Sequence, residues 1–182
     1  MGLYRAGFEV VGVDIKPQPR YPFTFVQADA SKPPFRLEDF DFIWASPPCQ
    51  AHSALVHLHP EREYPCYIER TRALLEGCGR PYCMENVPGA PLKVTFMLCG
   101  SSFGLQLRRH RIFEASHSIL TPECLHAMHG RPIDVSGTGA RRINRRPDDH
   151  GGNTNKPRNI AEARNAMGID WMTRKELSHA IP

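Results

Sequence analysis

Short apolar stretches separated by turn residues run along the first 115 residues and predict strands. Residues 65–76 predict a helix, with Pro65 near its first turn and Gly77 beyond its end. A short helix over residues 3–7 is expected to stop at Gly7. Strands separated by helices or loops are typical of an α/β fold with a parallel sheet. The predicted strands cover residues 8–13, 23–26, 40–45, 81–87 and 111–115.

The pattern changes after residue 115. Residues 116–157 contain HGRP, SGTGARR and NRRPDDHGGNTNKP with almost no apolar periodicity, which predicts an irregular insertion. Beyond it, Asn159 is expected to cap a helix that stops at Gly168, and Thr173 with Glu176 forms a capping box for a last helix. We therefore expect three parts: an α/β core (1–115), the insertion (116–157) and C-terminal helices that return to the core (158–182).

Composition narrows the class of protein. The chain has 182 residues, of which 41% are hydrophobic and 23% charged, values ordinary for a globular domain. No apolar run approaches the ~20 residues that cross a bilayer, and the N-terminus has no secretory pattern. Six cysteines without a CxxC pair predict mostly buried, reduced thiols and a cytoplasmic protein without membrane contact.

The charge is unevenly distributed. The net charge is +4, and residues 105–165 hold 11 Lys and Arg against 6 Asp and Glu, whereas residues 1–104 hold 10 against 11. A basic stretch of this kind favours contact with nucleic-acid phosphates. A solvated basic loop is the plainer interpretation and stays open.

Chemistry-bearing side chains follow several predicted strands. Asp14, Asp29, Cys49 and Glu85 lie at or just past strand ends, the edge where α/β sheets bind ligands. Cys49 follows two prolines that stiffen its turn, and a thiolate there is a strong nucleophile if its pKa is lowered. Taken alone, such a cysteine is more often a packing residue and such a glutamate more often a cap or an ion-pair partner.

A pair of arginines completes the ordered set of motifs. Arg109 and Arg111 stand at alternating positions, which on a strand places both on one face able to hold an anion. The chain resembles the catalytic core of DNA cytosine-5 methyltransferases in three motifs, which occur in this order: SPPCQ (46–50), ENV (85–87) and RHRIF (109–113). The phrases SPPCQAHS, YCMENVPGAPL and ARNAMGIDWMTRKELSHAIP are similar to the compact phage-encoded branch of that family.

The resemblance implies a fold. The implied fold is a truncated Rossmann-like S-adenosylmethionine-dependent methyltransferase fold with a small irregular recognition insertion. The insertion is residues 116–157, which take the place of the family's target-recognition region. Met1 aligns after the family's opening strand and glycine-rich cofactor loop, and residue 182 aligns before its closing segment. Leu107 stands where a glutamine often precedes the paired arginines.

The resemblance also implies a reaction. Cys49 adds to C6 of a cytosine flipped out of double-stranded DNA, Glu85 protonates N3, and C5 takes the methyl group of S-adenosylmethionine. Arg109 and Arg111 hold the base carbonyl and a phosphate. The implied setting is DNA methylation of the restriction-modification type by a phage or prophage protein in a bacterial host. The implied catalytic positions are Cys49, Glu85, Arg109, Arg111, Pro48, which shapes the nucleophile turn, and Asn86, which supports the loop.

The cofactor and DNA contacts follow from the same resemblance. Asp14 matches the residue that binds the cofactor ribose, Asp29 the residue near the adenine amino group, and Ser46 and Pro47 complete the cofactor set. The insertion is expected to contact DNA through Arg141, Arg142, Arg145 and Arg146.

Two other functions stay open. One is a degenerate, non-catalytic DNA-binding relative without a complete cofactor site. The other is a different reaction at pyrimidine C5 or C6 that uses the same Cys49 and Glu85.

Remaining side chains receive plainer predictions. Four side chains of the insertion have zinc-ligand chemistry: His117, Cys124, His126 and His129. Their spacing fits no standard zinc site, so no metal is predicted. The simpler interpretation is that the histidines lie on loops near phosphate. The side chains predicted to pack in the core are Phe42, Trp44, Cys66, Cys78, Cys83 and Cys99.

Overall fold

The structure is a computed structural model that describes residues 1–52, 61, 63–127, 130–135 and 155–180. The described chain is of mixed α/β composition with small sheets. It divides into two compact units. Unit 1 comprises residues 1–92 with 114–117, and unit 2 comprises residues 93–113 with 118–182.

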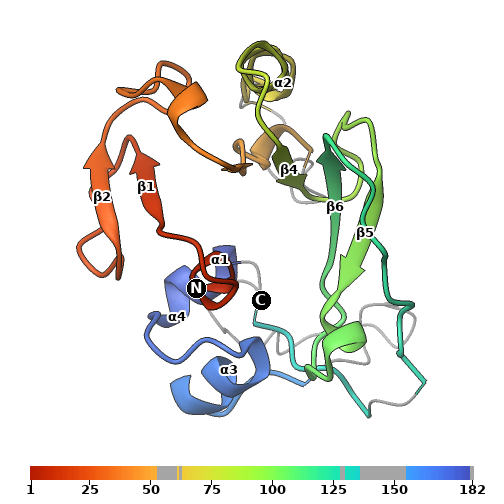
Figure 1. The fold of residues 1–182 in the computed structure, drawn as a ribbon. Helices are drawn as coiled ribbons and strands as arrows, with labels where there is room; N and C mark the ends of the chain where they lie inside the picture. Colours follow the sequence, from red (N-terminus) through yellow and green to blue (C-terminus); the bar gives the residue numbers. More distant parts are fainter. Residues whose placement is uncertain (53–60, 62, 128–129, 136–154, 181–182) are drawn as a thin grey trace. The chain divides into compact units, whose positions relative to one another are not determined.

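Unit 1 opens with a short helix and a pair of parallel strands. Helix α1 (Gly2–Arg5) is followed by β1 (Val11–Asp14) and β2 (Thr24–Gln27), with Asp14 opposite Gln27 (Figure 1). Gly7 adopts a φ of 94° after α1, a left-handed conformation that favours glycine and agrees with the predicted stop. A Cβ at Gly12 would lie 2.6 Å from the Tyr21 ring, so a larger residue at this point of β1 would have to displace that ring.

A second parallel pair forms the other part of unit 1. The strands β3 (Ile43–Ala45) and β4 (Tyr82–Asn86) pair with Ala45 opposite Met84. Between them lie the 3₁₀ turn η2 (Gln50–His52) and helix α2 (Ile68–Gly77), while η1 (Leu37–Asp39) precedes β3. All five residues of β4 are buried. Both parallel pairs confirm predicted strands: β1, β3 and β4 are shorter than expected, and β2 is shifted by one residue.

Strand β5 (Phe96–Cys99) was not predicted. It pairs antiparallel with β6 (His110–Ala115), so the expectation of a parallel sheet does not hold for this pair (Figure 1). The reason is the connection: a parallel pair needs a crossover of a dozen or more residues, whereas residues 100–109 are a short link containing η4 (Gly100–Phe103). The four-stranded sheet has the order β3-β4-β6-β5, and β6 contributes its first residues to unit 2 and its last to unit 1.

In unit 2, helix α3 begins and ends where the sequence predicts, and α4 begins where the sequence predicts. Helix α3 (Ile160–Met167) is capped by the Asn159 side chain, which accepts a hydrogen bond from the Glu162 N–H at 2.9 Å. Thr173 and Glu176 form the predicted capping box of α4 (Arg174–His179). The apolar cluster on which these helices pack consists of Leu107, Ile133, Val135, Ala163, Ala166, Met167 and Leu177.

Two packing predictions are wrong. Trp44 is 40% exposed because β3 is only three residues long and Trp44 lies on its outer side, where the indole N–H donates to Ser46 Oγ at 2.9 Å. Cys66 is exposed because it lies in the segment before α2. None of the six cysteines is in a disulfide, but only Cys83 and Cys99 are buried, so the expectation of mostly buried thiols is also wrong. Among the described residues, no helix combines the length and apolar character needed to cross a membrane.

Candidate functional site

The Cys49 turn begins directly at the end of β3. Strand β3 ends at Ala45, and Ser46, Pro47 and Pro48 lead to Cys49 without an intervening element. The Cys49 side chain is half-buried, and its carbonyl accepts a hydrogen bond from the His52 N–H at 3.0 Å, which closes the turn into η2. The thiol is thus held on a short, proline-stiffened turn and remains partly accessible, as the sequence predicts.

The end of β4 is joined to this turn by a buried amide. Asn86 is 1% exposed, and its Nδ2 donates to the Pro47 carbonyl at 3.0 Å, while its Oδ1 accepts from the Val87 N–H at 2.9 Å. Glu85, the residue before it, is 6% exposed. Because β3 and β4 are parallel neighbours, their carboxyl ends meet at one sheet edge. The structure therefore brings the Cys49 turn and the Glu85–Asn86 pair to the same edge.

Cys83 is a second thiol on β4, two residues before Glu85. Burial, and to a smaller extent the charge of Glu85, raises the pKa of Cys83 to about 12. Cys83 therefore stays protonated at neutral pH, and it is a packing residue as predicted. Of the two thiols at these strands, Cys49 alone combines accessibility with a position on the turn.

The two predicted cofactor carboxylates follow β1 and β2. Asp14 accepts hydrogen bonds from the Lys16 N–H at 2.8 Å and the Gln18 amide at 3.2 Å, and Asp29 accepts from the Ser31 N–H at 2.9 Å. Hydrogen bonds from Ser31 lower the pKa of Asp29. Since the Ala28 N–H donates to the Asp14 carbonyl at 3.1 Å, both carboxylates belong to one end of the same strand pair. Ionised carboxylates are pure acceptors, the role that ribose hydroxyls and an adenine amino group require.

The two predicted arginines belong to unit 2, whereas Cys49 and Glu85 belong to unit 1. Arg109 precedes β6, and its guanidinium donates to the carbonyls of Leu177 at 3.2 Å and Ser178 at 2.5 Å. Arg111 lies within β6 and donates to the His110 carbonyl at 2.9 Å. Arg109 thereby also satisfies carbonyl groups near the end of α4, a stabilising role for a cation. The predicted DNA contacts Arg141, Arg142, Arg145 and Arg146 lie outside the described residues, as does His129.

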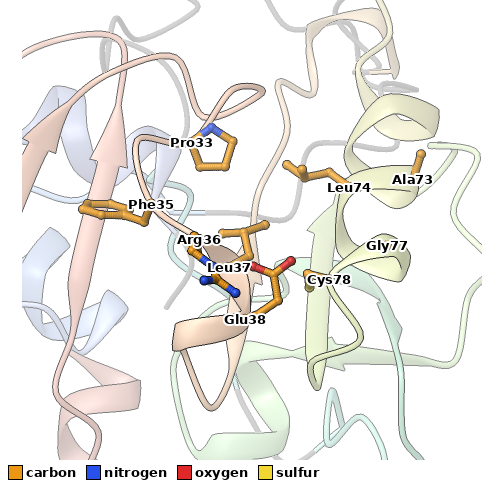
Figure 2. Close-up of a pocket in the computed structure, with 9 residues that line it drawn as sticks. All are labelled: Pro33, Phe35, Arg36, Leu37, Glu38, Ala73, Leu74, Gly77 and Cys78. Atoms are coloured by element: carbon orange, nitrogen blue, oxygen red, sulfur yellow. Dashed lines mark ion pairs between the residues drawn. The ribbon is translucent and has the colours of Figure 1, made fainter.

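Unit 1 has a pocket of about 270 Å³ between the segment around η1 and helix α2. Figure 2 shows Pro33, Phe35 and Leu37 on one side of it and Leu74 on the other. The residues that line it include none of the four predicted cofactor residues. A second pocket of about 210 Å³ lies in unit 2 beside Arg108 and Arg109. We assign no ligand to either pocket.

Sequence reasoning missed two clusters. In unit 1, His52 Nε2 lies 3.2 Å from the Cys66 sulfur. In unit 2, Cys99 and His110 join Cys124 and His126, two of the residues weighed above for zinc, whereas His117 instead contacts Ser116 Oγ at 3.3 Å. Knowledge that β5 and β6 pair antiparallel would have revealed the second cluster, because this register places Cys99 opposite His110.

Replacing Asn86 with aspartate is expected to destabilise the protein by about 1–3 kcal/mol. The carboxylate would lose the hydrogen bond to the Pro47 carbonyl and place a charge in a buried position. The urea midpoint of the variant measures the loss. Gln50→Glu is the control, because it makes the same amide-to-acid change at an exposed position of the same turn. Equal midpoints for the two variants would contradict the prediction.

We compared the chain with known proteins by family, sequence and structure. No protein-family model, no curated protein and no solved structure matches it. The functional assignment therefore depends on the ordered motifs and on the geometry described above.

Proposed function

We propose that this chain transfers a methyl group from S-adenosylmethionine to C5 of cytosine in double-stranded DNA. The observation that supports this most is the hydrogen bond from Asn86 to the Pro47 carbonyl. It fixes the turn that carries a partly accessible Cys49 against the strand end that carries Glu85. The reaction needs a thiol and an acid on one pyrimidine ring, and this arrangement supplies both from one sheet edge.

The chemistry assigns a task to each group. The Cys49 thiolate adds to C6 of the flipped base, Glu85 gives a proton to N3, and the electron pair released into the ring makes C5 nucleophilic. S-Adenosylmethionine, when bound, supplies the electrophilic methyl group that C5 takes. Loss of the C5 proton to a base then breaks the bond between Cys49 and C6, which regenerates the thiolate. N3 returns its proton to Glu85, and 5-methylcytosine is released. Asp14 and Asp29 fit the ribose hydroxyls and the adenine amino group as hydrogen-bond acceptors.

The strand pairing supports the Rossmann-like part of the proposal. A doubly wound sheet has the order 3-2-1-4-5-6. In the resemblance, β1 and β2 correspond to strands 2 and 3 of that order, and β3 and β4 to strands 4 and 5. The two observed parallel pairs, β1 with β2 and β3 with β4, are the neighbours that this order requires on either side of strand 1.

A covalent trap tests the proposal. Because the recognition sequence is unknown, the probe is a long random-sequence duplex in which every cytosine is replaced by 5-fluorocytosine. The fluorine blocks loss of the C5 substituent, so the enzyme stays attached to the methylated base. With S-adenosylmethionine present, we expect a denaturation-resistant protein–DNA complex with the adduct on Cys49. It should be absent from Cys49→Ser and present in Cys66→Ser, which alters an exposed thiol outside the turn.

The outcomes separate the candidates. No adduct from the folded protein with bound cofactor would overturn the proposal, and so would an adduct that persists in Cys49→Ser. Mass spectrometry of ordinary DNA after treatment is expected to show 5-methylcytosine. A different mass increment on the base would instead support another reaction at C5 or C6.

A non-catalytic DNA-binding relative is the second candidate, and one contact favours it. The guanidinium of Arg109 donates to two carbonyls near the end of α4, a structural task for a residue that the resemblance places on the base. This candidate expects DNA binding whose affinity falls steeply with salt, without measurable affinity for S-adenosylmethionine. Calorimetric titration with S-adenosylmethionine distinguishes the two, because tight binding would exclude the second candidate.

A further inference from the structure

Four side chains with metal-binding atoms converge in unit 2. They are Cys99, His110, Cys124 and His126, and their ligand atoms all lie within 4.8 Å of one another. The Cys99 sulfur is 3.2 Å from His126 Nε2, and the Cys124 sulfur is 3.5 Å from His110 Nε2. We refer to these four residues as the Cys₂His₂ cluster. No part of the proposed methyl transfer uses it.

The fold brings the cluster together from three segments. Cys99 ends β5 and His110 begins β6, and the antiparallel register places the two directly opposite each other. Cys124 and His126 come from the segment after β6 and are separated by one residue. Two ligands thus come from a strand pair and two from a segment without regular structure.

Supporting hydrogen bonds hold both halves of the cluster. Ser101 is fully buried, and its hydroxyl donates to the Cys99 sulfur at 3.2 Å. The same oxygen accepts the Leu125 N–H at 3.2 Å, between Cys124 and His126. Arg108 donates to the His126 carbonyl at 3.0 Å. Partners of this kind orient metal ligands and are as much a part of a metal site as the ligands themselves.

We propose that the Cys₂His₂ cluster binds a structural zinc ion. Zinc takes four thiolate and imidazole ligands in a tetrahedron, with bonds of about 2.0–2.3 Å that leave ligand atoms about 3.3–3.8 Å apart. The two sulfur–nitrogen separations of 3.2 and 3.5 Å are close to this spacing. Four protein ligands leave no open position, which is typical of structural rather than catalytic zinc. Two soft thiolates select zinc over the oxygen-preferring magnesium and calcium.

Binding has a consequence for the fold of unit 2. Both thiols lose their protons to solvent and ligate as thiolates. The ion then joins the segment that carries Cys124 and His126 to the β5–β6 pair. That segment has exposed apolar side chains, Leu120 at 99% and Leu125 at 40%, so it has little packing of its own to hold it. We therefore expect its order to depend on the metal.

The test uses the whole chain, purified under reducing conditions without chelator. Elemental analysis is expected to find about one zinc ion per chain. After exchange with cobalt(II), the visible spectrum should show intense tetrahedral ligand-field bands and sulfur-to-cobalt charge transfer. Cys124→Ser should weaken cobalt binding by more than tenfold and reduce the charge-transfer absorption. The control is Cys66→Ser combined with His117→Gln, which removes a cysteine and a histidine outside the cluster and should leave the spectrum unchanged.

Two further variants keep the test decisive if Cys124→Ser fails to fold. His126→Cys retains four ligands and should raise the charge-transfer absorption by about half, as three thiolates replace two. Ser101→Ala removes a supporting hydrogen bond and should weaken metal affinity about 10–100-fold. A reduced, folded protein that contains no zinc and gives no tetrahedral cobalt spectrum would overturn the proposal. A spectrum that survives Cys124→Ser unchanged, or a Cys99–Cys124 disulfide that persists under reducing conditions, would do so too.

Discussion

Glutamine in place of Glu85 is expected to slow methyl transfer by about 10²–10⁴-fold, the usual worth of a positioned general acid. Glu85 is the acid that the proposed reaction needs at N3, and it occupies a buried strand end beside Asn86. Glutamine has nearly the same shape, and its amide can donate a hydrogen bond to N3 but cannot transfer a proton. Addition of Cys49 to C6 should therefore become the slow step. Single-turnover methylation with labelled S-adenosylmethionine measures this rate.

The control and the adduct assay separate catalysis from folding. Glu9→Gln makes the same change at an exposed position of unit 1 and should leave the rate unchanged. Adduct formation with the 5-fluorocytosine duplex should slow in Glu85→Gln by the same factor as methylation, because both need addition at C6. A Glu85→Gln protein that methylates at the parent rate would remove Glu85 from the mechanism. A loss of methylation with unaltered adduct formation would place its role after the addition step.

Elements controlled by near neighbours in the sequence were predicted well. The bounds of α3 follow from Asn159 and Gly168, and the start of α4 follows from the Thr173 and Glu176 capping box, because each cap bonds within four residues. The position of Cys49 on a turn after β3 follows from the same kind of local signal.

Features that depend on pairing across the sequence were not predicted. The FMLC stretch of β5 has no alternation that separates it from a loop, and its strand character comes from pairing with β6. The Cys₂His₂ cluster depends on that same pairing, since Cys99 and His110 are eleven positions apart and meet only in the antiparallel register. The hydrogen bond from Asn86 to the Pro47 carbonyl spans 39 positions, so the ENV motif alone gives no sign of it.

A buried ion pair of unit 1 leads to the largest expected loss of stability. Arg72 of α2 forms a two-pronged ion pair with Glu114 of β6, with Nε and Nη2 each 2.7 Å from a carboxylate oxygen. Arg72 is 5% and Glu114 2% exposed, and Nη2 also donates to the Pro91 carbonyl at 3.0 Å. Removing Arg72 takes the ion-pair partner from the buried Glu114 carboxylate. Removing Glu114 leaves the buried Arg72 guanidinium with only the exposed Glu69, 2.5 Å from Nη1, as its ion-pair partner among the described residues. We expect Arg72→Met or Glu114→Leu to cost about 3–5 kcal/mol of the free energy of unfolding.

The unfolding of unit 1 has to be measured separately from that of unit 2, and tryptophan fluorescence allows this because each unit contains one tryptophan. Trp44 lies in unit 1 and Trp171 in unit 2. Trp171 Nε1 is buried and has no hydrogen-bond partner among the residues that the structure describes, so Trp171→Phe is a mild change that leaves Trp44 fluorescence as the probe of urea unfolding. Arg70→Met, an exposed arginine on the same helix, is the control and should shift stability by less than about 0.5 kcal/mol.

A double variant decides what the ion pair contributes. Taking two charges out of water costs about as much as their attraction returns, so Arg72→Met combined with Glu114→Leu should be much more stable than the sum of the single losses predicts. If the ion pair were instead strongly stabilising by itself, the double variant would be as unstable as the worse single variant. Single variants within 1 kcal/mol of the parent would contradict the buried pair itself, because an exposed ion pair contributes about that much or less.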